Sequence, residues 1–376
     1  MRIGVVGAGI GGLAVASGLA ARGHDVTVFE RADAVRSGGS GITLAPNALT
    51  SLDYLGIGAP FRELQRAQPK LLGGQRAPDG RWLSRLAPDV TVKSLAVDRA
   101  ELSDLLLKQT GQADVRTGAH VATVEPHSGE VVLESGERFA FDLVVGADGI
   151  HSAVRRAWPN DPGSAYAGYS VWRGISPGVG DEELAASETL GAGERFGIVP
   201  LHDGRVYWFA VASMPDPGRS DPLTADELTQ RFANWHDPIR ELISSTPASA
   251  IQFLPIRELA RDLDTFTREH AVLLGDAAHA MTPNFGQGAC QALEDAAVLV
   301  SQLAKHPDDV QAALSSYDEI RRPRAQMFAR QSRVIGKALH VGGRRTAAFR
   351  NGLLAAVPDA VIARPVASLG EWRVPE

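Results

Sequence analysis

The chain has 376 residues, which suggests two domains or one large one, and its 44% hydrophobic and 22% charged residues are typical of a folded globular protein. A formal net charge of −6 argues against broad binding to nucleic acids or anionic membranes, because both require a basic surface. The single cysteine, Cys290, excludes an intrachain disulfide and suits a reducing cytoplasm. The 39 glycines exceed the usual share of about 7%, and their positions are informative.

An uncharged segment, residues 3–21, follows the first two residues of the chain. It could be mistaken for a signal peptide or a membrane span, but it contains six glycines, which suit neither. No other run approaches the ~20 apolar residues that a spanning helix requires. The sequence therefore predicts a soluble, cytoplasmic protein without a membrane anchor.

The N-terminal segment has the pattern of a strand, a glycine-rich turn, a helix and a second strand. Residues 2–6 are an apolar run typical of a buried parallel strand, and residues 13–21 have helical character. Between them stands Gly-Ala-Gly-Ile-Gly-Gly, residues 7–12. A second apolar run, residues 25–30, ends in an acid, Glu30.

These residue types at this spacing suit a dinucleotide. Gly7 permits a tight turn, Gly9 lets a pyrophosphate approach the backbone, and Gly12 lets the helix pack closely on the strand. Glu30, 18 residues after Gly12, can accept hydrogen bonds from ribose hydroxyls and disfavours the 2′-phosphate of NADP. The pattern predicts FAD or NAD at this site. The alternative is a tight turn in an α/β fold without a ligand.

Four later segments favour FAD over NAD. An NAD dehydrogenase would continue with regularly alternating strands and helices, and this chain does not. Residues 38–44 are rich in glycine, residues 142–149 are an apolar strand ending in Asp-Gly, and residues 271–276 are another ending in Gly-Asp. Residues 283–288, Pro-Asn-Phe-Gly-Gln-Gly, then precede a helix predicted over 289–304.

Taken together, these motifs resemble the class A flavoprotein aromatic hydroxylases, which have the p-hydroxybenzoate hydroxylase fold. The resemblance covers essentially the whole chain and implies an α/β (α+β overall) architecture with C-terminal helices. It implies a Rossmann-like FAD-binding domain assembled from residues 1–70, 95–160 and 265–376. Residues 71–94 and 161–264 would form an inserted, mainly antiparallel β-sheet domain for the substrate.

The resemblance also implies which residues contact a non-covalently bound FAD. The ADP half would lie against Gly7, Gly9, Gly11, Gly12, Glu30, Arg31 and Val121. The flavin, its side chain and the pyrophosphate would lie against Gly41, Ile42, Thr43, Arg99, Asp148, Asp276, Pro283, Gly286, Gln287, Gly288 and Ala289. The glycines from Gly38 to Gly41 would let one flavin loop move.

The loop before the predicted helix at 289–304 has a chemical reason to meet a flavin that does not depend on the resemblance. A helix N-terminus carries about half a positive charge, which would stabilise negative charge on the pyrimidine edge of a reduced flavin. Pro283 would pack beside the flavin ring. The alternative is that residues 283–288 are a loop with an ordinary helix cap.

The middle of the chain has short β-rich runs bounded by Gly, Pro and Asp, at residues 169–175, 195–200 and 205–211. Asp203-Gly204 predicts a hairpin between the last two. Three tryptophans flank or lie in this sheet, and they either line an aromatic-substrate pocket or fill the core of the sheet. They are Trp158, Trp172 and Trp208.

Arg195 and Tyr207 lie on the two strands of the predicted hairpin. Their types and spacing resemble the substrate pair of FAD-dependent urate hydroxylases, a branch of the same family, although urate itself is not implied. Arg195 would anchor an anionic or carbonyl-rich ring, and Tyr207 would orient it. The alternative is a solvent-facing arginine and a packed tyrosine.

The helical pattern returns over residues 308–340. Its cluster of basic residues, 321–324, is predicted to be a solvated, kinked surface, with a lid or partner site as the alternative. No metal site is predicted, because His279 and Cys290 lack partners at ligand spacing. No catalytic residue is assigned.

The resemblance implies an FAD monooxygenase. NADH or NADPH would reduce the flavin, O₂ would add to give a C4a-hydroperoxide, and one oxygen atom would pass to an aromatic or heteroaromatic small molecule. Epoxidation, N-hydroxylation or halogenation on the same scaffold is the alternative, and a non-catalytic binding protein is a more remote one. The expected partners are the substrate, O₂ and NAD(P)H, without nucleic acid, for a monomer or homodimer.

Overall fold

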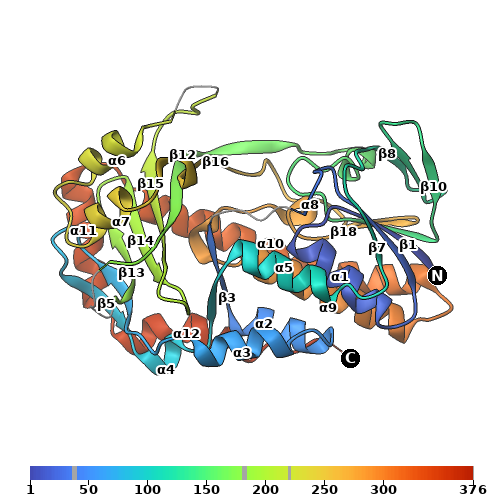
Figure 1. Cartoon of the computed structure of the whole chain (residues 1–376), viewed down its shortest axis with the longest axis horizontal. Coiled ribbons are helices and arrows are strands. Elements are labelled where there is room, and N and C mark those ends of the chain that lie inside the picture. The colour runs from blue at the N-terminus through green and yellow to red at the C-terminus, as the bar shows by residue number, and fades with distance from the viewer. Residues whose placement is uncertain (36–39, 180–183, 219–221, 376) are drawn as a thin grey trace.

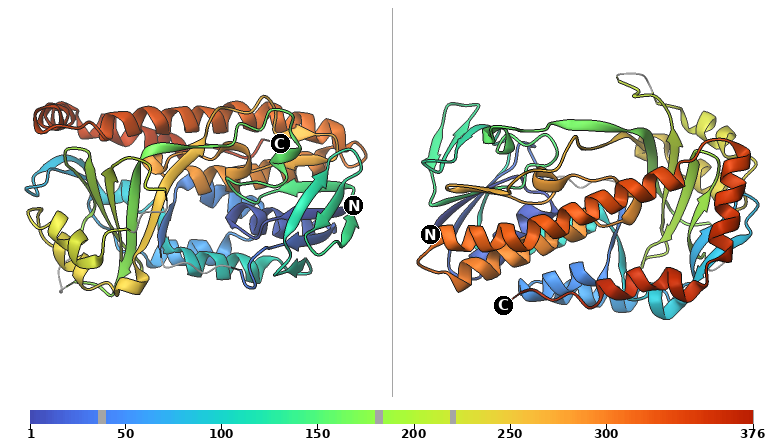
Figure 2. Two further views of the ribbon diagram at one scale, coloured as in Figure 1. Left: turned by 90° about the horizontal axis from the view of Figure 1, so that it is seen from above. Right: turned by 180° about the vertical axis from the view of Figure 1, so that it is seen from behind.

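The computed structural model describes residues 1–35, 40–179, 184–218 and 222–375. Two large β-sheets lie at opposite ends of the molecule, and helix α10 (Val310–Leu339) runs between them (Figure 1, Figure 2). The predicted fold class, α/β with a second, mainly antiparallel sheet and C-terminal helices, is confirmed.

The sheet beside the N-terminus has six strands in the order β17-β18-β11-β1-β2-β7. The last five in this order are parallel, and β17 pairs antiparallel at the edge. Val5 is fully buried beside Val28 and Val145, its partners on the two neighbouring strands, as expected of a covered parallel sheet. The strands are β1 (Arg2–Val6), β2 (Asp25–Phe29), β7 (Asp114–Arg116), β11 (Leu143–Gly146), β17 (Thr267–Arg268) and β18 (Ala271–Leu273).

The other large sheet has seven strands in the order β16-β12-β15-β14-β13-β4-β5. Neighbours pair antiparallel except β13 and β4. The predicted hairpin is confirmed: β14 pairs with β15, and Gly204 takes a φ of +86° in the turn. The strands are β4 (Gly73–Arg76), β5 (Trp82–Leu86), β12 (Ser164–Ser176), β13 (Ala186–Leu190), β14 (Glu194–Pro200), β15 (Val206–Ser213) and β16 (Gln252–Leu259).

One face of this sheet is a hydrophobic core. Trp172 and Trp208 are buried there beneath helices α6 (Ala225–Arg231) and α7 (Ile239–Ser244). Trp158 is buried in the core of the parallel sheet instead, and its ring N–H donates to a backbone carbonyl. Filling of the core of this sheet, one of the two alternatives for the tryptophans, is therefore confirmed for Trp172 and Trp208 but not for Trp158.

The opposite face, which we call the inner face, carries Arg173, Arg195 and Tyr207. Val211 pairs with Arg195, and Tyr207 pairs with Val199. Cross-strand partners share a face, and side chains return to the same face every second residue. Arg195 and Tyr207 therefore share the inner face, four positions apart along the strands, or about 13 Å.

The remaining elements are two small sheets and the other helices. β3 (Gly41–Leu44) pairs with β6 (Leu95–Asp98), and β8 (Val121–Glu125), β9 (Glu130–Leu133) and β10 (Arg138–Ala140) form a small sheet. The other helices are α1 (Ile10–Ala20), α2 (Pro46–Tyr54), α3 (Ala59–Ala67), α4 (Pro88–Thr91), α5 (Arg99–Gln109), α8 (Asp276–His279), α9 (Gly288–Lys305), α11 (Arg344–Ala356) and α12 (Asp359–Leu369). The 3-10 helices are η1 (Arg155–Ala157), η2 (Ala248–Ala250) and η3 (Pro283–Phe285).

No single helix of the described residues is long and apolar enough to cross a bilayer. Helices α11 and α12, which meet at 86°, have the length and composition of a broken span when they are taken together.

Replacing Trp208 with alanine should lower the free energy of unfolding by about 3–5 kcal/mol, because a fully buried indole is lost from the core beneath α6 and α7. Urea unfolding followed by circular dichroism measures the change. Phe349→Ala is the control, since this ring is 70% exposed on α11 and its loss should change the value by no more than about 0.5 kcal/mol. Equal losses in both variants would contradict the placement of Trp208.

Candidate functional site

The carboxyl ends of the parallel strands bring four predicted segments together. The glycine turn follows β1, Glu30 follows β2, Asp148 follows β11 and Asp276 follows β18. Ligands of open α/β sheets bind at this edge. Asp276 is exposed there, as the first residue of α8.

The glycine turn has the shape that a pyrophosphate needs. Gly7 has a φ of +103°, and a Cβ at Gly12 would collide with the carbonyl oxygen of Gly7. Both positions therefore exclude larger residues. A Cβ on Gly9 would meet no atom within 4 Å, so its backbone borders open space before the N-terminus of α1. This cradle fits a dinucleotide phosphate.

The adenosine end of the predicted site forms around Glu30. Its carboxylate accepts hydrogen bonds from the backbone N–H groups of Ala8, at 2.9 Å, and Ala32, at 3.0 Å. The N–H of Ala119 donates to the Glu30 carbonyl, which places the segment leading to Val121 beside Glu30 and Arg31. The structure therefore brings these three predicted residues together.

The predicted flavin loop at β3 is held against β6 and β15. Gly41 pairs with Asp98, and Arg99, exposed at the start of α5, donates its backbone N–H to the carbonyl of Ser40 at 2.8 Å. A Cβ on Gly41 would collide with the ring of Tyr207, so glycine is needed for this close approach. Gly38 and Gly39, predicted to let the loop move, lie outside the described residues.

Two positive charges, those of Arg173 and Arg99, lie near Tyr207. Burial raises the pKa of the Tyr207 phenol, and the charges of Arg173 and Arg99 only partly oppose this. Burial lowers the pKa of Arg173, and the nearby Arg99 lowers it further. Arg173 donates from Nε to the side chain of Gln252 at 3.1 Å. Tyr207 is therefore a neutral hydrogen-bonding group next to two cations.

Arg195 is not exposed to solvent, so the solvent-facing arginine of that alternative is wrong, whereas its packed tyrosine is confirmed by the close approach of Tyr207 to Gly41. It is 3% exposed, forms an ion pair with Glu188 at 2.8 Å and donates from Nη2 to the side-chain oxygen of Asn284 at 2.8 Å. Asn284, in η3, also donates to the hydroxyl of Tyr169 at 2.9 Å. The strand–strand packing buries the guanidinium, and the linkage to η3 could not be read from residue spacing.

His340 is a further polar residue beside Arg195 that the sequence did not point to. Its ring centroid lies 3.8 Å from that of Tyr169. Burial and the charges of Arg195 and Arg350 lower the pKa of His340 to about 4. Among the described residues, both ring nitrogens of His340 and the Nε of Arg195 are buried without a hydrogen-bond partner.

The predicted loop at 283–289 ends in a helix, as expected. Pro283 is exposed at the start of η3, Gly286 adopts a left-handed φ of +62°, and α9 begins at Gly288. A Cβ on either glycine would meet no atom within 4 Å. The positive end of α9 therefore borders open space, and this fits the electron-rich edge of a flavin.

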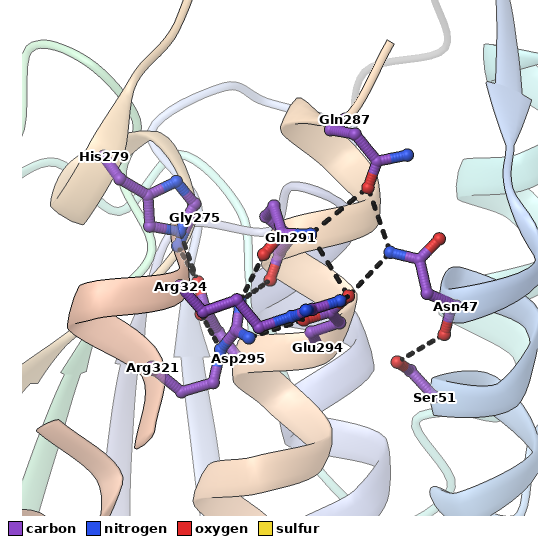
Figure 3. A network of polar contacts seen from close by, with 10 residues as sticks. All are labelled: Asn47, Ser51, Gly275, His279, Gln287, Gln291, Glu294, Asp295, Arg321 and Arg324. Carbon is purple, nitrogen blue, oxygen red and sulfur yellow. Dashed lines mark hydrogen bonds and ion pairs between the residues drawn. The ribbon is translucent and has the colours of Figure 1, made fainter. Parts of the chain in front are cut away.

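Buried ion pairs fix α9 against α10 (Figure 3). Arg321 is fully buried and pairs with Glu294 and with Asp295, the latter at 2.7 Å, and Arg324 pairs with Glu294 at 2.6 Å. The prediction of a solvated surface at residues 321–324 is therefore wrong for Arg321. The two acids interrupt an apolar helix at 289–304, which is the one sequence signal for this pairing.

Asp295 also connects α9 to the end of β18. It accepts hydrogen bonds from the backbone N–H of Gly275 at 2.9 Å and pairs with His279 at 2.6 Å. Burial alone would raise the pKa of Asp295, but the charges of His279 and Arg321 outweigh it and lower the pKa to about 2. The carboxylate thus anchors the turn that carries Asp276.

Asp148 caps the turn after β11. Its carboxylate accepts hydrogen bonds from the Ser152 hydroxyl at 2.5 Å and from the backbone N–H groups of Ala153, at 2.6 Å, and Val154, at 3.2 Å. Burial raises the pKa of Asp148, although these hydrogen bonds oppose the shift.

The described residues contain no group of three metal-ligating side chains.

Cys290, the single thiol, should be unreactive in the folded protein. Burial raises its pKa to about 12, and only the thiolate reacts quickly with disulfides. Titration with Ellman's reagent should detect no fast-reacting thiol in the native protein and one per chain in urea. Fast release of one equivalent under native conditions would show that the start of α9 is open.

Comparisons with known proteins find relatives along nearly the whole chain. The chain is 38% identical over 344 residues to an aurachin C monooxygenase/isomerase from Stigmatella aurantiaca, covering 89% of this chain and 88% of the relative. It is 32% identical over 353 residues to a 3-amino-4-hydroxybenzoate 2-monooxygenase from Streptomyces cremeus, covering 91% and 88%. The crystal structure of Klebsiella pneumoniae HpxO with FAD and uric acid has a TM-score of 0.88 at 26% identity, covering 99% and 97%.

A family model described as an FAD binding domain matches residues 1–332. The match contains the glycine turn, the predicted flavin loops at residues 41–44 and 283–289, and the whole of α9. The chain therefore belongs to the FAD binding domain family, and its resemblance to the class A flavoprotein aromatic hydroxylases is confirmed.

Proposed function

We propose that this protein is an FAD-dependent monooxygenase that uses NADH or NADPH and O₂ to hydroxylate an aromatic or heteroaromatic small molecule. One observation carries the proposal: the inner face meets both flavin loops. Tyr207 lies against Gly41, and Arg195 is hydrogen-bonded to Asn284 in η3. A ring bound on the inner face would lie beside the loops expected to hold the flavin.

The residues proposed to hold FAD follow one path. It begins at the glycine turn and Glu30, passes the carboxyl edge of the parallel sheet at Asp148 and Asp276, and ends at residues 283–289. FAD, when bound, supplies electron transfer from the nicotinamide and the activation of O₂. The chain binds the cofactor, excludes water and stabilises negative charge at the N-terminus of α9.

The inner face supplies the contacts proposed for the substrate. The raised pKa of Tyr207 keeps its phenol protonated near neutral pH, so it can donate a hydrogen bond while Arg173 supplies positive charge. At the other end, Arg195 and the neutral His340 have buried nitrogens free to bond among the described residues. This combination suits an electron-rich ring with hydroxyl, carbonyl or carboxylate substituents.

The relatives support the same class of substrate. One is named for 3-amino-4-hydroxybenzoate, and the structural neighbour was solved with uric acid. Both molecules are small, electron-rich rings with oxygen substituents. Epoxidation, N-hydroxylation and halogenation remain the alternative reactions, and the identity of the product distinguishes them.

We also propose a division of the chain into two domains. Residues 1–70, 95–160 and 265–376 would bind FAD, and residues 71–94 and 161–264 would bind the substrate. The division is supported by β4 and β5, which join the seven-stranded sheet although they are separated from its other strands in the sequence.

The proposal predicts that the purified protein is yellow or becomes so when FAD is added, and that a ring substrate stimulates NADH or NADPH oxidation. Arg195→Ala and Tyr207→Phe should each lower kcat/KM by about 10- to 100-fold, because each removes a contact to the substrate. Mass spectrometry of the product, with ¹⁸O₂, measures oxygen insertion.

Tyr54→Phe is a matched control, since Tyr54 lies on α2 beside Arg22, and kcat/KM should not change. Unchanged turnover in both inner-face variants would make the substrate assignment wrong. A colourless protein with no affinity for added FAD would overturn the function as a whole.

A further inference from the structure

The buried network of Figure 3 gives the amide of Gln287 a fixed direction. Glu294 is fully buried and accepts hydrogen bonds from the side-chain NH₂ groups of Asn47, at 2.6 Å, and Gln291, at 3.1 Å. An ionised carboxylate only accepts hydrogen bonds, so both amides must turn their NH₂ groups toward it. Arg321 fixes Gln291 a second time by donating to its side-chain oxygen at 2.7 Å.

The same two NH₂ groups determine which way Gln287 points. They also donate to its side-chain oxygen, from Asn47 at 3.0 Å and from Gln291 at 3.2 Å. A reversed Gln287 would bring its own NH₂ against two other NH₂ groups. Its NH₂ therefore points away from the network, as Figure 3 shows, and none of the described residues accepts a hydrogen bond from it.

Gln287 stands immediately before the first residue of α9 and is 2% exposed. Its outward NH₂ group thus lies at the positive end of the helix. Both belong to the loop proposed to meet the pyrimidine edge of the flavin. A reduced flavin carries negative charge there, so a donor at this position would stabilise the reduced form more than the oxidised form.

We propose that Asn47, Gln291 and Glu294 are positioning residues that hold the Gln287 NH₂ as a hydrogen-bond donor to the flavin and thereby raise its reduction potential. The inference rests on the proposed function, because it requires FAD at the loop before α9. It assigns a role to the buried charge of Glu294. The charges of Arg321 and Arg324 hold Glu294. Glu294 orients the amides of Asn47 and Gln291, and these two amides orient the amide of Gln287.

The test uses holoenzyme and measures the two-electron reduction potential of bound FAD against a reference dye. Gln287→Met removes the donor at similar volume and should lower the preference for reduced over oxidised flavin about tenfold, which corresponds to about 30 mV. Asn47→Leu combined with Gln291→Met leaves Gln287 in place but unheld, and it should lower the potential by a similar amount. Adding Gln287→Met to that pair should cause no further decrease in the potential, because the double variant and Gln287→Met remove the same hydrogen bond to the flavin.

Ser51→Ala is the matched control. Ser51 is buried on the same helix as Asn47, and within the network its hydroxyl donates only to the backbone carbonyl of Asn47, at 2.9 Å. The reduction potential of Ser51→Ala should therefore equal that of the wild type. Gln291→Met alone, which leaves the α2 contact intact, replaces the double variant if the latter does not fold, and it should lower the potential by a smaller amount.

A purely structural network would give a different result. The double variant would then lower the urea midpoint while the potential stayed at the wild-type value, and that outcome overturns the inference. Fully additive effects in the triple variant would overturn it as well. If wild-type protein binds no FAD, the proposed function fails; if it binds FAD and Gln287→Met has the wild-type potential, only the present inference fails.

Discussion

The arrangement of α2, α9, α10 and the end of β18 depends on charges that have no access to water. Glu294 and Asp295 on α9 are fully buried, and so is Arg321 on α10. An unpaired charge in such a place costs about 3–5 kcal/mol, so the two helices cannot slide or rotate past each other without breaking these pairs. Because Asp295 also binds Gly275, and Glu294 binds Asn47, one cluster sets the positions of β18, α2 and both helices.

The two loops proposed to contact the flavin, at β3 and at η3, are held from opposite sides. Gly41 is fixed by β6 and by the ring of Tyr207, whereas η3 is fixed through Asn284 by Arg195. Residues from one strand hairpin thus support both loops. The geometry of the seven-stranded sheet is therefore coupled to both loops. This coupling needs no contact between the two large sheets.

The local elements could be predicted because their patterns are local. The glycine turn with its flanking strands, the hairpin at Gly204, and α9 each follow from a short run of residues. The errors concern segments far apart in sequence. Arg321 belongs to a basic run that looks solvated until α9 supplies Glu294, 27 residues earlier. Asn284 and His340 carry no spacing signal, since their roles depend on which strand of the sheet lies beside them.

Side chains of β15 point alternately to the two faces of the sheet, so one set packs in the core and the other lies on the inner face. Trp208 and its even-numbered neighbours belong to the core beneath α6 and α7, whereas Tyr207, Phe209 and Val211 belong to the inner face. Side chains on the inner face can therefore be exchanged during evolution with little effect on that core. On the proposal that the inner face binds the substrate, related enzymes would acquire different ring specificities through odd-numbered positions of β15, while the even-numbered positions keep the sheet folded.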